Sequence, residues 1–154
     1  MSSQAYAQKP ASPIDLEARF LRAETSFWDT FGVKLSKNGQ QVGPTFFSVV
    51  PDEAVAGSSD AKRHAHRARV FHGFVIGVDL AGLGLVAGGF AVRASNEHEW
   101  TTASKLMVGG GLLALLSDGI FILARHNEIL AAVNSYNHDL ITGRLETEQS
   151  KASP

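Results

Sequence analysis

Two aspartates lie inside long apolar stretches of the sequence, and no other feature suggests chemistry as strongly. An ionisable side chain in such a stretch is costly to bury, so it usually faces other protein groups or water. If the carboxyl groups of Asp79 and Asp118 approach each other, they could share a proton or bind a cation, or one could accept a hydrogen bond from His72 or Arg125. The alternative is that each aspartate only hydrogen-bonds to a neighbouring helix.

Histidines near the same ends of the two stretches could serve as ligands. His72 and His126 are the pair that a bis-histidine haem would use if they lay on facing surfaces. The run KRHAHRARVFH has no metal-ligand spacing, so no metal and no cofactor is predicted, and haem is kept as an alternative. The chain contains no cysteine, nucleophile elbow, phosphate loop or HExxH motif, so we expect no enzymatic activity.

Small residues recur along one face of the first apolar stretch, at intervals of four, four, three and four residues. Such a stripe lets helix backbones approach closely, and close packing drives helix association in lipid. The second stretch has a weaker stripe. We predict that these residues pack the two helices together and also pack copies of the chain: Gly73, Gly77, Ala81, Gly84 and Gly88 in the first stretch, and Gly110, Ala114 and Ser117 in the second.

The elements that carry these residues are predicted to be two membrane-spanning helices. As helices, residues 70–92 would extend about 34 Å and residues 106–124 about 28 Å, against a hydrocarbon core of about 30 Å. Basic residues are concentrated before the first span, whereas the link between the spans holds only Arg93 and Lys105. The positive-inside rule therefore places both termini in the cytoplasm, and we expect a bacterial inner membrane. The residues predicted to meet lipid headgroups are Lys62, Arg63, Arg67 and Arg69.

The region before the hairpin is predicted to be cytoplasmic. Residues 1–12 are small and polar and are expected to be a disordered lead. Residues 13–58 are expected to form an N-terminal region with an amphipathic helix at 13–31 and a short β-hairpin at 33–42, centred on an Asn-Gly dipeptide.

The transmembrane hairpin is assigned to residues 59–141. It includes an amphipathic helix at 125–141 that continues the second span, and residues 142–154 are predicted to be a polar tail. Apolar side chains on the two amphipathic helices could dock a partner, or they could pack on each other or lie on the membrane surface. The docking candidates are Phe27, Trp28 and Phe31 in the first helix, and Ile129, Val133 and Tyr136 in the second.

The sequence thus predicts an all-α membrane protein built on a glycine-rich two-helix transmembrane hairpin. The alternative is a soluble helical bundle that buries both helices. With 14 basic and 15 acidic residues, nothing attracts the chain to nucleic acid.

Three functions fit these patterns. The first is a non-enzymatic membrane subunit or scaffold, which assembles into a homo-oligomer or larger membrane complex through its spans and docks a cytoplasmic partner. The second is an oligomeric pore or ion- or proton-conducting assembly that uses Asp79 and Asp118. The third is a haem- or quinone-binding subunit of a redox complex.

Overall fold

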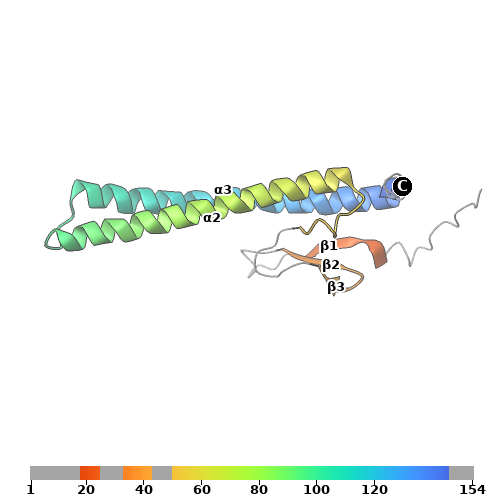
Figure 1. The fold of residues 1–154 in the computed structure, drawn as a ribbon, viewed down its shortest axis with the longest axis horizontal. Coiled ribbons are helices and arrows are strands. Elements are labelled where there is room, and N and C mark those ends of the chain that lie inside the picture. Colours follow the sequence, from red (N-terminus) through yellow and green to blue (C-terminus); the bar gives the residue numbers. More distant parts are fainter. Residues whose placement is uncertain (1–17, 25–32, 43–49, 146–154) are drawn as a thin grey trace, which may run out of the picture.

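The computed structural model describes residues 18–24, 33–42 and 50–145, which form a helical hairpin with a small sheet beside one end (Figure 1). Helices α2 (Ser59–Ser95) and α3 (Thr102–Ile141) run antiparallel and lie side by side. The sheet is antiparallel, in the order β1-β2-β3, and lies next to the half of the hairpin that is remote from the connecting loop. Its strands are β1 (Leu21–Glu24), β2 (Lys34–Lys37) and β3 (Gln40–Gln41).

Both long helices begin at side-chain caps and continue without a break. Ser58 Oγ and Thr101 Oγ1 each accept a hydrogen bond, at 3.1 Å, from the backbone N–H three residues further on. The apolar segments 70–92 and 106–124 lie inside α2 and α3. The predicted helix at 125–141 is the second half of α3, so it continues the apolar segment as expected.

The short β-hairpin predicted at 33–42 is present. Strands β2 and β3 are joined through Asn38 and Gly39, whose φ angles are 54° and 71°. A two-residue turn of type I′ needs positive φ at both central residues, which Asn-Gly tolerates best. The backbone N–H of Val42 donates to the carbonyl of Leu35 at 2.7 Å and extends the pairing past the turn.

The helix predicted at 13–31 is wrong over Leu21–Glu24, which form β1. Leu21 is buried and the next residue, Arg22, is exposed, so the side chains alternate with the period of a strand. A distant side chain holds this strand: Asn137 accepts from the N–H of Leu21 at 2.9 Å and donates to its carbonyl at 2.8 Å. These tertiary contacts outweigh the local helical pattern. Residues 1–17 and 25–32 lie outside the described part of the chain.

The polar tail predicted at 142–154 starts before the packed part of the chain ends. Leu145 is buried in the hydrophobic core, and its side chain lies over Gly57, at 3.5 Å from where a Cβ on that glycine would be. Gly57 has a φ of 88°, a left-handed conformation that a glycine adopts without strain. The chain therefore stays packed through Leu145, and the remainder of the predicted tail lies outside the described residues.

Helices α2 and α3 pack through positions seven residues apart. Gly82 and Gly111 lie against each other, because a Cβ on Gly111 would be only 2.6 Å from the carbonyl oxygen of Gly82. A Cβ on Gly89 would be 2.9 Å from the carbonyl oxygen of Ser104. This sustained spacing is typical of a left-handed antiparallel coiled coil. The buried positions that follow this seven-residue spacing are Ala61, Ala68, Val75, Gly82 and Gly89 in α2, and Ser104, Gly111, Asp118, Arg125, Ala132 and Asp139 in α3.

The hydrophobic core and the exposed apolar side chains occupy opposite halves of the hairpin. The core lies at the sheet end, where Leu21, Leu35 and Val55 belong to one cluster with Ile129 and Leu140. In the other half, large apolar side chains of both helices and of the connecting loop are exposed. We call them the apolar band: Val70, Phe74, Ile76, Leu80, Leu83, Leu85, Phe90, Trp100, Leu106, Leu112, Leu113, Leu116, Ile120 and Leu123.

Candidate functional site

The polar residues of the hairpin interior meet between α2 and α3. Asp118 and Arg125 occupy successive heptad positions of α3 and are only 6% and 5% exposed. Asp79 and His72 lie on α2, and His72 forms a hydrogen bond with Arg125. Of the four residues that the sequence suggested could interact, the structure brings His72 and Arg125 into contact, and the approach of Asp79 to Asp118 remains a prediction.

The contact between His72 and Arg125 defines the state of the imidazole. Arg125 Nη1 lies 3.0 Å from His72 Nδ1, across the hairpin. A guanidinium group only donates hydrogen bonds, so Nδ1 must be the acceptor. An imidazole that accepts at Nδ1 is neutral and carries its proton on Nε2. Among these four residues, Arg125 therefore supplies the positive charge.

Asp118 has an unsatisfied oxygen in this interior. Its Oδ1 atom is buried and has no hydrogen-bond partner within the part of the chain that the structure describes. The register set by Gly82 and Gly111 places Asp118 opposite Val75, so its surroundings on that side are apolar. Buried polar atoms normally have partners. This oxygen is therefore a candidate position for a proton or a small cation.

The haem alternative requires His72 and His126 to face each other. His72 faces Arg125, and His126 is the next residue of α3, about 100° further around the helix. Among the described residues, no group of three or more His, Asp or Glu side chains is arranged to hold a metal ion. A haem- or quinone-binding role remains a prediction, and the contact of His72 with Arg125 does not favour it.

The glycines that bring the helices together are not the predicted ones. A Cβ on Gly73, Gly77, Gly84 or Gly110 would meet nothing within 4 Å, so these residues do not pack α2 against α3. Gly88 is an exception, since a Cβ there would lie 2.7 Å from Met107 Cε. The close approach is made by Gly82, Gly89 and Gly111, which lie on a different helix face. Whether the outward stripe packs copies of the chain remains a prediction.

The weaker stripe of α3 lies at the edge of the helix contact. Ala114 and Ser117 are partly buried, and the Ser117 hydroxyl donates to the carbonyl of Ala114 at 2.7 Å, within α3. On α2, Ala81 is exposed and lines a shallow apolar groove with the outward glycines. The groove residues are Val70, Gly73, Phe74, Gly77, Val78 and Ala81.

The predicted headgroup residues lie at the start of α2, next to the apolar band. Each of the three arginines has a carboxylate neighbour, whereas Lys62 is simply exposed. The side chains of Arg63 and Arg67 remain 60% and 54% exposed despite these neighbours. This end of α2 can still present positive charge to an anionic surface. The carboxylates are Asp60 for Arg63, Glu128 for Arg67 and Asp52 for Arg69.

The docking surface predicted on the C-terminal helix is wrong. Ile129, Val133 and Tyr136 are 1%, 5% and 4% exposed, so they are not available to a partner. They pack within the chain's own core, against the sheet and the start of α2. The sequence left open that the two amphipathic helices pack on each other, but the partners seen here are the sheet and α2. The other predicted docking residues, Phe27, Trp28 and Phe31, lie outside the described residues.

Two polar contacts that the sequence did not indicate hold the sheet on α3. Asn137 pairs with the backbone of Leu21, as described above. Lys37 Nζ donates to the Tyr136 hydroxyl at 2.7 Å and also lies 4.6 Å from the centre of its ring. Asn137 and Tyr136 are adjacent in the sequence, but nothing in their spacing identifies strand partners about a hundred residues away.

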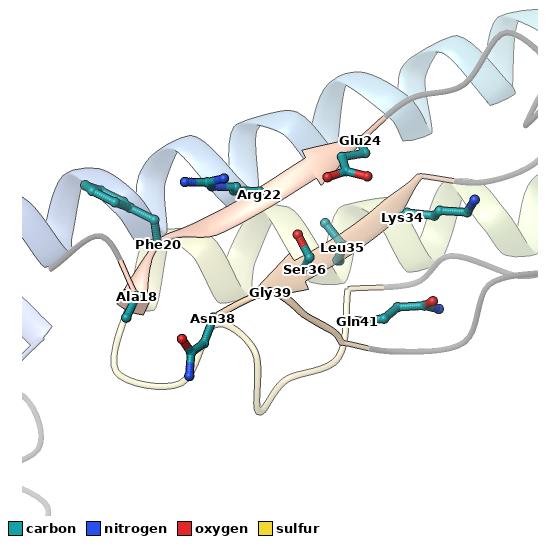
Figure 2. Close-up of a pocket in the computed structure, with 10 residues that line it drawn as sticks. All are labelled: Ala18, Phe20, Arg22, Glu24, Lys34, Leu35, Ser36, Asn38, Gly39 and Gln41. Carbon is teal, nitrogen blue, oxygen red and sulfur yellow. The ribbon is translucent and has the colours of Figure 1, made fainter. Parts of the chain in front are cut away.

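The outer face of the sheet carries an open pocket (Figure 2). Alternation in β1 and β2 turns Leu21 and Leu35 toward the helices and leaves Arg22, Glu24 and Lys34 on the exposed side. Glu24 lies directly opposite Lys34 in the strand register. The pocket has charges of both signs and polar side chains. Its lining residues are Ala18, Phe20, Arg22, Glu24, Lys34, Leu35, Ser36, Asn38, Gly39 and Gln41.

The loop between the helices has its own ordered contacts. The ring of Trp100 packs edge-on against Phe90, with centroids 5.7 Å apart, and the Arg93 guanidinium lies 4.6 Å from its centre. Arg93 Nε donates to the carbonyl of His98 at 3.0 Å. An aromatic ring next to a cation at the end of an apolar segment is typical of residues that lie at a membrane interface.

Comparison with protein-family models, with curated proteins and with solved structures finds no match to this chain.

Proposed function

We propose that this protein is a non-enzymatic integral membrane scaffold. The α2–α3 hairpin crosses the bilayer twice with both termini in the cytoplasm, and it holds the small sheet-containing unit at the membrane surface. The spans assemble copies of the chain, or join it to a larger membrane complex, and the cytoplasmic unit docks a partner. A bacterial inner membrane is the location that we propose.

One observation supports the membrane part of this proposal: the most apolar segments of both helices expose their large apolar side chains instead of burying them. Both helices are long and apolar enough to cross a membrane. Only 17% of the most apolar window of α2 and 11% of that of α3 is buried within the protein. A core helix of a soluble protein would bury these residues, whereas lipid accommodates them without cost. The soluble-bundle alternative leaves the whole apolar band facing water.

The distribution of charge supports the proposed orientation. Within the apolar segments 70–92 and 106–124, Asp79 and Asp118 are the only acidic or basic residues apart from His72. The four basic residues before the first segment outnumber the two between the segments, Arg93 and Lys105, which lie at the loop ends of α2 and α3. Since cytoplasmic flanks carry the excess of Lys and Arg, the sheet-containing end is the cytoplasmic one.

The outward stripe of α2 supports the proposed assembly. Gly73, Gly77 and Gly84 have open space beside them and lie within the apolar band. The groove over Gly73 and Gly77 is shallow and apolar, so another transmembrane helix could approach the α2 backbone closely there. A helix from a second copy and a helix from another membrane protein both fit this chemistry.

The surface that we propose for docking a cytoplasmic partner is the outer face of the sheet. Because Ile129, Val133 and Tyr136 of α3 are buried, we place the docking site on the outer sheet face, where Arg22, Glu24 and Lys34 line a concave surface. Its mixed charges favour a polar segment of a protein partner over an apolar helix.

Charged substitutions in the apolar band test the membrane proposal. In the variant Leu83→Lys/Leu113→Lys, each span receives one lysine near its centre, which costs about 2.5–3.5 kcal/mol per residue on the insertion scale. We expect the variant to be lost from the membrane fraction after alkaline carbonate extraction, while the wild type stays. Ile141→Lys is the matched control, because Ile141 is 66% exposed but lies outside the band. Recovery of the wild type in the soluble fraction without detergent would contradict the proposal.

A further inference from the structure

We propose that the outer face of α2 binds one anionic phospholipid of the cytoplasmic leaflet. Its phosphate group binds Arg63 and Arg67, and an acyl chain lies in the apolar groove that runs from Val70 to Ala81. The inference rests on the proposed membrane insertion and orientation, and it adds a defined lipid site to the scaffold function.

The site consists of two adjoining hollows that share Val70. The first lies next to the basic start of α2, and it is lined by Arg67, Val70, Phe71 and Glu128. The second is the shallow apolar groove, which begins at Val70. A cationic side chain therefore lies at the mouth of an apolar groove. A phospholipid has the complementary arrangement, an anionic phosphate group at the end of an apolar chain.

The arginines and the groove lie on one face of α2. Residues three or four apart are neighbours on a helix surface. Arg67 follows Arg63 by four residues, and Val70 follows Arg67 by three. The same steps continue through the groove, at Phe74, Gly77 and Ala81. A lipid that lies along this face can therefore reach both arginines with its phosphate group while its acyl chain stays on apolar surface.

The length of the groove matches the depth of one leaflet. Val70 and Ala81 are 11 residues apart, which is about 16 Å along a helix. Half of the hydrocarbon core is about 15 Å. The groove therefore extends from the cytoplasmic boundary to about the middle of the bilayer, which is the depth that an acyl chain of that leaflet occupies. A transmembrane helix would continue across the other leaflet.

The groove is already formed in the hairpin. Phe74, which lines it, stacks on Phe121 of α3, with ring centroids 5.7 Å apart and 16° between the ring planes. Gly73 and Gly77 also line it, and a Cβ on either would meet nothing within 4 Å. An acyl chain can therefore enter this space without a rearrangement of the protein.

Both arginines can donate hydrogen bonds to a phosphate group. Arg67 Nη1 lies 3.9 Å from Glu128 Oε1, which is an ion pair but too long for a hydrogen bond. The other oxygen of Glu128 accepts a hydrogen bond from His64 Nδ1 at 2.6 Å. Arg63 Nη2 lies 3.2 Å from Asp60 Oδ1, but both side chains are mostly exposed, and such pairs contribute little. Paired hydrogen bonds from a guanidinium to phosphate are stronger.

Charge favours a lipid over a second copy at the mouth of the groove. Copies inserted with the same orientation would pair α2 in parallel and bring Arg63 and Arg67 of both copies to the same level. Like charges repel at close range, whereas an anionic headgroup offsets them. A lipid and another helix exclude each other at Gly73 and Gly77, so a bound lipid competes with the assembly proposed above.

Native mass spectrometry of the full chain in detergent tests the site, with phosphatidylglycerol and phosphatidylcholine of the same acyl chains as probes. We expect the wild type to retain one phosphatidylglycerol in preference to phosphatidylcholine. Arg67→Gln should weaken this retention about fivefold, because a basic residue near anionic lipid contributes about 1 kcal/mol. Lys105→Gln is the matched control, since it removes a positive charge at the loop end of α3. Equal losses in the two variants would contradict a site at Arg67.

Gly73→Leu tests the groove separately from the charge. Its side chain would occupy the open space beside Gly73 while both arginines stay in place, so phosphatidylglycerol retention should fall. Gly119→Leu is the control, because a Cβ there also meets nothing within 4 Å but the residue lies on α3, outside the groove. Circular dichroism checks that each variant keeps its helices. Unchanged retention in Gly73→Leu would show that no acyl chain lies in the groove.

The wild type alone can overturn the inference, whatever the variants do. Equal retention of the two lipids would do so. A lipid-free dimer that persists in phosphatidylglycerol would also do so, because a second copy would then fill the groove. Flotation with phosphatidylcholine vesicles reports separately on insertion. If the chain floats but shows no preference for phosphatidylglycerol, the lipid site fails and the membrane proposal stands; if it does not float, the membrane proposal itself fails.

Discussion

At the scale of single residues, the glycines on the two faces of α2 have different surroundings. Gly82 faces α3 and has no room for a side chain, whereas Gly77 faces outward and has open space beside it. Both lie in the same apolar segment. The sequence reveals two possible stripes, but one helix alone does not show which stripe faces its neighbour. Matching the seven-residue spacing of Gly82 and Gly89 to that of Ser104 and Gly111 would have identified the right one.

Substitution of single glycines by leucine separates these roles. Gly111→Leu should destabilise the hairpin by at least the roughly 1–3 kcal/mol that overpacking costs, because its Cβ would meet the backbone of Gly82. Gly77→Leu should leave the hairpin stable but remove self-association. Gly119→Leu is the control, since a Cβ there meets nothing within 4 Å and the residue lies outside the stripe.

Unfolding in SDS, followed by circular dichroism, measures the stability of these three variants, and native mass spectrometry in detergent measures their association. Equal stability of Gly111→Leu and Gly119→Leu would contradict the described helix contact. Unchanged association in Gly77→Leu would contradict the proposed role of the stripe.

At the scale of elements, the sequence predicted what local patterns determine and missed what distant contacts determine. The two helices follow from their long apolar segments, and the turn of the β-hairpin follows from Asn38 and Gly39. Strand β1 could not be predicted, because its geometry depends on an amide of α3, at Asn137. That Asp79 and Asp118 approach each other stays a prediction, whereas the hydrogen bond between His72 and Arg125 could be found only from the register of the two helices.

Asn137→Ala tests the tertiary origin of β1. The variant leaves the N–H and carbonyl of Leu21 without their partner on α3, and an unsatisfied buried group costs about 1–3 kcal/mol. We expect faster hydrogen exchange at the amides of Leu21–Glu24, while α2 and α3 stay protected. Asn134→Ala is the matched control, because Asn134 is exposed on the same helix. If both variants exchange at the wild-type rate, Asn137 does not hold the strand.

At the scale of the whole molecule, the protein is divided into a half that buries its own apolar residues and a half that exposes them. The core joins the sheet to the polar ends of both helices, while the apolar band surrounds the half nearer the loop (Figure 1). This division is what a membrane anchor with a folded cytoplasmic unit requires. The sequence predicted the apolar segments, but the burial of Ile129 and Tyr136 in the chain's own core depended on the sheet that covers them.

Cysteine labelling tests the proposed double crossing most directly, because the chain has no cysteine of its own. Single cysteines at Lys62, Glu99 and Leu113 sample the predicted cytoplasmic side, the loop and the bilayer interior. With a membrane-impermeable maleimide on cells whose outer envelope is permeabilised, Glu99→Cys should react at once. Lys62→Cys should react only after the inner membrane is opened, and Leu113→Cys should react only after denaturation. Reaction of Lys62→Cys and Glu99→Cys from the same side, or ready labelling of Leu113→Cys in the native protein, would contradict the transmembrane hairpin.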